Sequence, residues 1–162
     1  MSKRRTLTVT KPRVKNAYEL LEKVCEVIKE EPRRYDQTTW GISGKQETKR
    51  HYENTAPACG TVACRAGWIV FLHDGPQVFR RATDIESRAK EIIGLSLPTG
   101  HLFSEGACVT ERRVGYEDLY EDSTVKKHAE EGVKGLQRYM KKYSAKLKAR
   151  KLSDVPKVKG SW

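Results

Sequence analysis

Hydrophobic positions along the chain recur mostly at helical spacing. After Asn16, a residue type that caps helices, apolar side chains repeat every three or four positions until Pro32 interrupts the pattern. These apolar positions are Ala17, Leu20, Leu21, Val24, Val27 and Ile28. A second stretch opens with a capping box, Thr83 with Glu86, and closes at Gly94. The pattern predicts an amphipathic helix in each stretch.

A third stretch predicts one long amphipathic helix near the C-terminus. Its apolar positions step by three or four residues along Val125, Ala129, Val133, Leu136, Met140, Tyr143 and Leu147. The opposite face carries the basic residues Lys134, Arg138, Lys141, Lys142 and Lys148. This helix would therefore bury one side and present a cationic side to the solvent.

The segment 62–72 differs from these three because it is apolar on nearly all sides. Arg65 is its one clearly polar residue, and Asp74, Gly75 and Pro76 follow as a stop signal. A helix that is apolar all round must be surrounded by other elements. We therefore expect an all-α fold, a small helical bundle in which three or four helices wrap a buried central helix.

The remaining segments suggest one domain with two basic extensions. We expect a basic N-terminal arm at residues 1–15, a single helical domain at 16–150, and a basic C-terminal tail at 151–162 that is loose from Ser153. Residues Thr6–Thr10 alternate as a strand does, but Pro12 limits them to a brief edge strand at most. Residues 32–58 form a long polar connection whose large anchors are Tyr35 and Trp40.

Charge is distributed unevenly along the 162 residues, whose formal net charge is +11. Residues 1–15 and 134–162 together hold +15, whereas the 118 residues between them hold −4. Clustered cations bind polyanions strongly because each phosphate contact releases condensed counterions. Lysine-rich ends that only keep the protein in solution are the alternative, since no base-reading motif accompanies them. The candidate nucleic-acid-binding residues are Lys3, Arg4, Arg5, Lys11, Arg13, Lys15, Lys134, Arg138, Lys141, Lys142, Lys148, Arg150 and Lys151.

The cysteines offer a second kind of chemistry. Gly60 and Thr61 would place Cys59 just before the first turn of the central helix, where the helix dipole favours a thiolate. A nucleophilic thiol also needs a base, and the chain holds four histidines: His51, His73, His101 and His128. Because no spacing pairs Cys59 with any of them, we assign no catalytic residue and keep Cys59 as the candidate of an alternative thiol enzyme.

Metal binding is a weaker interpretation of the same region. His51, Cys59, Cys64 and His73 are ligand types that suit zinc, but their spacing lacks the two tight pairs typical of structural zinc sites. We therefore assign neither a metal nor a cofactor, and we interpret Cys64 as a small core residue.

The sequence also indicates the cellular compartment in which the protein is expected. No run of about 18 apolar residues is present, and the basic N-terminus lacks the apolar region of a secretory signal. We expect a cytoplasmic protein with reduced thiols and no membrane partner.

One block of the sequence resembles a group of small uncharacterised proteins from actinobacteria and their phages. The matching pattern spans about residues 16–104 and centres on C-G-T-x-A-C-x-A-G-W. Its residues here are Trp40, Cys59, Gly60, Thr61, Ala63, Cys64, Ala66, Gly67, Trp68, Gly94, Leu95, Leu102 and Phe103. The resemblance implies a phage or mobile-element origin, and hence the host cytoplasm, but no activity.

Together these features predict a non-enzymatic small binding protein whose basic termini engage nucleic acid or an acidic protein surface. Two alternatives stay open. One is the thiol enzyme with Cys59 as nucleophile, and the other is a phage protein that binds and modulates a host protein through residues 32–58.

Overall fold

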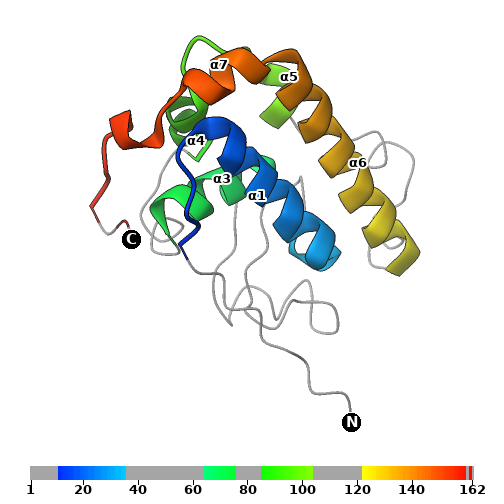
Figure 1. Ribbon diagram of the computed structural model, residues 1–162. Helices are drawn as coiled ribbons and strands as arrows, with labels where there is room; N and C mark the ends of the chain where they lie inside the picture. The colour runs from blue at the N-terminus through cyan, green and yellow to red at the C-terminus, as the bar shows by residue number, and fades with distance from the viewer. Residues whose placement is uncertain (1–10, 36–63, 76–84, 104–121, 160, 162) are drawn as a thin grey trace.

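The computed structural model describes residues 11–35, 64–75, 85–103, 122–159 and 161 (Figure 1). These residues form helices and short helical turns, which confirms the predicted all-α bundle. The elements are α1 (Ala17–Glu30), η1 (Pro32–Arg34), α3 (Arg65–Asp74), α4 (Ile85–Ile93), α5 (Gly100–Phe103), α6 (Asp122–Lys142), α7 (Ser144–Ala149) and η6 (Leu152–Asp154). The segment Thr6–Thr10, where we expected at most a brief edge strand, lies outside the described residues.

Helix α1 begins where the sequence predicts. The Asn16 Oδ1 accepts a hydrogen bond from the Glu19 amide at 3.0 Å, and the Glu19 carboxylate accepts from the Lys15 amide at 2.8 Å. The bond from the Glu19 amide satisfies one of the backbone donors that the first turn of a helix leaves without partners, and the bond from the Lys15 amide holds the chain just before the cap. The helix buries one stripe completely, namely Ala17, Leu20, Leu21, Val24 and Ile28. Pro32 follows and starts η1.

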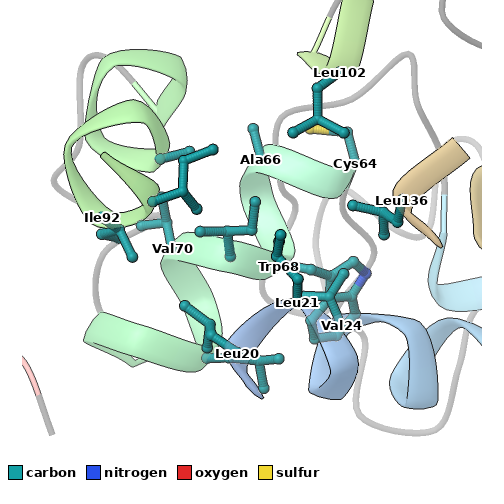
Figure 2. Close-up of a cluster of buried hydrophobic side chains, with 14 of the residues drawn as sticks. Leu20, Leu21, Val24, Cys64, Ala66, Trp68, Val70, Ile92, Leu102 and Leu136 are labelled. Atoms are coloured by element: carbon teal, nitrogen blue, oxygen red, sulfur yellow. The ribbon is translucent and has the colours of Figure 1, made fainter. Parts of the chain in front are cut away.

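Helix α3 is the centre of the bundle, as its apolar composition predicts. Trp68, Ile69 and Val70 are fully buried, and α3 contacts α1, α4 and α5. Figure 2 shows how side chains from several helices meet around it, including Leu21 of α1 and Ile92 of α4. The buried face of α1 thus packs on a helix that has no solvent-facing side.

The start of α3 differs from our expectation. Its N-cap residue is Cys64, whose Sγ accepts a hydrogen bond from the Gly67 amide at 3.4 Å. The thiol at the helix start is therefore Cys64, and the expected position of Cys59 directly before the first turn is wrong. Arg65, the polar residue of the stretch, is only 2% exposed. Val62, Ala63 and Cys59 itself lie outside the described residues.

The predicted long C-terminal helix is two helices. Tyr143 has φ −113° and ψ 20°, so the chain leaves helical geometry for one residue between α6 and α7. The bend lays α7 against α1 and buries Leu147 completely. The apolar spacing correctly identified Leu147 as a core residue. It could not reveal the break at Tyr143, because a single non-helical residue leaves the spacing almost unchanged.

The segment after α7 is packed, which corrects the expectation of a loose tail from Ser153. The Leu152 amide donates to the Lys15 carbonyl at 3.0 Å, next to an isolated bridge between Asn16 and Lys151. Val155 is only 4% exposed, and the Pro156 carbonyl accepts from Arg88 of α4 at 2.7 Å. Lys15 at the start of α1 and Leu152 after α7 therefore lie side by side.

Candidate nucleic-acid interface

Helix α6 presents a basic face opposite its buried face. At about 100° per residue, Lys127, Lys134, Arg138, Lys141 and Lys142 fall within an arc of about 100°. All five are exposed, whereas the opposite side of the helix is buried at Ala129, Val133, Leu136 and Met140. The amphipathic spacing of the sequence thus fixes where the cations point: away from the core.

These cations form no ion pairs within the part of the chain that the structure describes. In contrast, several cations of α1 and α4 are paired: Lys23 with Glu26, Arg88 with Asp74 and Glu91, and Lys90 with Glu86. The difference follows from the sequence, because residues 134–159 contain a single acid. That acid, Asp154, accepts a hydrogen bond from the Ser153 hydroxyl at 3.1 Å. The positive charge of this surface is therefore available to an external anion.

The basic face continues from α6 onto α7. Lys146 and Lys148 are exposed on α7, and the Lys148 Nζ lies 4.9 Å from the ring centroid of Tyr18 on α1. Lys142 lies similarly, 5.4 Å from the ring of Tyr143. We define the basic surface as Lys127, Lys134, Arg138, Lys141, Lys142, Lys146, Lys148 and Lys151. The sequence prediction named all of these except Lys127 and Lys146, although Lys127 shares the helical arc of the others.

Arg150 has a different role from the lysines around it. Its Nη2 donates to the Glu91 carbonyl at 2.7 Å and its Nε to the Ile92 carbonyl at 3.3 Å. These carbonyls end α4, where a helix lacks internal partners and carries a partial negative charge. The guanidinium therefore fastens the C-terminal segment to α4.

The N-terminal candidates divide between described and undescribed residues. Lys11, Arg13 and Lys15 are exposed, and Lys15 lies beside Leu152, so Lys15 adjoins the basic surface at Lys151. Lys3, Arg4 and Arg5 lie outside the described residues.

A buried ion pair joins α3 to α4. The Asp74 carboxylate, fully buried at the end of α3, accepts two hydrogen bonds from Arg88 at 2.8 and 2.9 Å. It also contacts the His73 Nδ1 at 2.6 Å. Burial alone would raise the pKa of Asp74, but the bonds from Arg88 and His73 outweigh it and hold this pKa below its ordinary value. Because Arg88 also binds the Pro156 carbonyl, the cluster joins α3, α4 and the C-terminal segment.

The described thiols do not form a nucleophilic site. Cys25 and Cys64 are buried thiols, and burial raises the pKa of Cys25 to about 11. Two of the four candidate bases have other contacts: His128 stacks on Tyr35 with centroids 4.9 Å apart, and His73 contacts Asp74. Cys59 and His51, together with the side chain of His101, lie outside the described residues.

The four-residue zinc set does not converge on one ion. Cys64 caps the start of α3 and His73 lies in its last turn, about 13 Å away along the helix axis. Ligands of a single zinc ion approach it to about 2.0–2.3 Å, so these two residues belong to different places in the fold. Among the described residues, no three histidine, cysteine or acidic side chains gather closely enough to hold a metal.

Comparisons with protein-family models, curated proteins and solved structures find no match to this chain. The resemblance to the actinobacterial and phage proteins therefore stays a prediction. Within the described residues, no helix combines the length and apolar character needed to cross a bilayer.

Proposed function

We propose that this protein binds nucleic acid through the phosphate backbone, using the basic surface of α6 and α7. The observation that supports the proposal is the row of exposed lysines and arginines without ion pairs, seated on a helix whose other face is core. A surface cation that is already paired with a carboxylate must give up that pair to bind a phosphate. An unpaired cation gains a partner on binding, and counterions are released from the nucleic acid.

Rigidity of the surface favours the same function. Lys134, Arg138 and Lys141 follow one another at three- and four-residue intervals, so each lies about one helical turn from the next. Their helix is anchored by Leu136 and Met140 in the core, which fixes the spacing of the cations. Only the side chains need to be ordered on binding, and this reduces the entropic cost.

We further propose that the binding is non-enzymatic and takes place in the cytoplasm. A cytoplasmic location suits a protein whose described cysteines, Cys25 and Cys64, are thiols. A phage or mobile-element origin, and the modulation of a host protein through residues 32–58, rest on the resemblance and are not needed for the binding proposed.

The test compares two doubly neutralised variants that lose the same charge. Arg138→Gln with Lys142→Gln removes two cations of the basic surface, and Lys23→Gln with Lys90→Gln removes two cations that are paired with glutamates. Affinity for a fluorescent 20-base-pair duplex is measured by anisotropy across a salt series. Loss of two phosphate contacts lowers the slope of log K against log [salt] by about 2.

We expect that loss for the first variant and almost none for the second. Equal effects of both variants would show that net charge, and not this surface, governs binding. Binding to an acidic protein surface in place of nucleic acid would appear as no affinity for the duplex at low salt.

A further inference from the structure

A cavity of about 670 Å³ opens between α1 and the end of α6, directly beside the basic surface. The two helices pack side by side (Figure 1). The buried side chains of Cys25 and Met140 lie at the floor, and the half-buried Tyr18 ring forms part of the wall. A volume of this order holds a small organic ligand, and the Tyr18 ring offers an aromatic surface among lining residues that are otherwise mostly polar or charged.

The polar groups around the cavity are of two kinds. On the α1 wall stands Glu22, an exposed carboxylate without an ion pair in the described part of the chain. On the α6–α7 wall stand the amide of Gln137 and the hydroxyl of Ser144. Lys141 lies at the edge and belongs to the basic surface as well, and Lys148 sits over the Tyr18 ring. Two carboxylates and one cation, Glu22, Glu26 and Lys29, thus line the α1 wall, and Lys141 and Lys148 lie where the cavity meets the basic surface.

This arrangement discriminates between ligands. The α1 wall carries both signs of charge, since Lys29 lines it together with Glu22 and with Glu26, which is paired with Lys23. An acidic peptide would bring a carboxylate toward Glu22, which would repel it. A nucleotide matches the two kinds of group, because its base carries N–H donors and its phosphate carries the negative charge. A base inside a duplex could not enter, since its ring is stacked and its edge is paired.

We propose that this cavity receives one unpaired base of a single-stranded nucleic acid, with a preference for bases that bear an amino group. The inference rests on the proposed function and adds to it the kind of nucleic acid that is bound. Tyr18 and Met140 contact the faces of the base, while Lys141 and Lys148 contact the adjoining phosphates.

The preference among bases follows from hydrogen-bond chemistry. A carboxylate accepts from the N4 amino group of cytosine, and a side-chain amide pairs with N6 and N7 of adenine. Glu22 and Gln137 supply these two groups. Thymine has no amino group, and its single donor, N3–H, lies between two carbonyl oxygens that would approach the Glu22 carboxylate unfavourably. Thymine should therefore bind there less tightly than cytosine.

The experiment measures affinities of the full chain for equally long oligo(dC), oligo(dT) and duplex DNA at one salt concentration. We expect oligo(dC) to bind about three- to tenfold more tightly than oligo(dT). Glu22→Gln should remove most of that difference and change duplex binding no more than a matched loss of another carboxylate of α1 does. The matched control, Glu30→Gln, removes an exposed carboxylate of α1 that does not line the cavity and should keep the difference.

A second readout locates the base directly. Photo-crosslinking of an oligonucleotide that contains 5-iodocytosine, followed by peptide mapping, should place the crosslink on Tyr18. The inference is wrong if oligo(dC) and oligo(dT) bind equally, or if crosslinks map away from this cavity. Unchanged salt-dependent duplex binding in that case would leave the proposed function standing, whereas absence of all polymer binding would remove both.

Discussion

At the scale of single residues, two glycines of α6 determine how closely it approaches buried side chains. A Cβ at Gly132 would lie 2.6 Å from two ring carbons of Tyr35, which is itself buried. A Cβ at Gly135 would lie 2.7 Å from the Arg65 Nη1, the far end of a flexible side chain. Two close contacts of α6 with buried side chains therefore help to hold the helix that carries the basic surface in place.

Gly132→Ala should destabilise the protein by about 1–2 kcal/mol, because overpacking against the rigid ring exceeds the helix propensity that alanine gains. Gly135→Ala should cost less, since the guanidinium can shift. Urea unfolding followed by circular dichroism measures both free energies. An equal or smaller cost at Gly132 would contradict the close packing of Tyr35.

Asp74 gives a second prediction at this scale. The folded protein has a lower pKa at Asp74 than the unfolded chain, whose ordinary value is 3.8, so the unfolded chain binds the proton first as the pH falls. The stabilisation of the fold by the ionised Asp74 is therefore complete above pH 3.8 and is lost as the pH falls through the lower pKa of the folded state. Asp74→Asn should cost about 3 kcal/mol near neutral pH, because Arg88 stays buried without its main partner.

The cost of Asp74→Asn should shrink steadily as the pH falls below about 4. Urea titrations of both proteins at several pH values measure the difference between their unfolding free energies. Asp154→Asn, which changes an exposed carboxylate, serves as the control. A difference that stays constant down to about pH 2 would show that Asp74 does not have the lowered pKa.

At the scale of elements, local sequence signals predicted most helix boundaries. Asn16 caps α1, Pro32 ends its pattern, and Gly94 stops α4 with φ +118°. Such signals act over one or two turns and are readable without a tertiary structure. The break at Tyr143 carries no glycine or proline, so its cause is the packing of α7 on α1, and no local pattern could predict it.

The C-terminal end of α7 carries one cation with a structural role, Arg150, and one that we propose binds phosphate, Lys148. Arg150→Gln should lower stability by about 1–2 kcal/mol, since the charged group's hydrogen bonds to the Glu91 and Ile92 carbonyls are lost. Lys148→Gln, the matched exposed change, should leave stability within about 0.5 kcal/mol but weaken binding. Thermal unfolding and duplex anisotropy on both variants check this division. A stability loss at Lys148 equal to that at Arg150 would overturn it.

At the scale of the whole molecule, the sequence predicted a helical body with cationic ends, and the structure adds how those ends are joined. Lys15 and Lys151 meet beside Asn16, so two charge clusters distant in sequence adjoin one surface. The cavity could not be foreseen, because it needs Tyr18 and Glu22 of one helix to face Gln137 of another. Such a register depends on packing between elements, which a single sequence does not encode locally.

The central claim is that unpaired cations on α6 and α7 bind phosphates. The salt dependence of affinity for a single-stranded oligonucleotide measures it most directly, because the slope of log K against log [salt] counts released counterions. If five or more of these cations contact phosphates of a single strand, we expect a straight line of log K against log [salt] with a slope of about −3.5 or steeper. A slope near zero, or no binding at low salt, would contradict it.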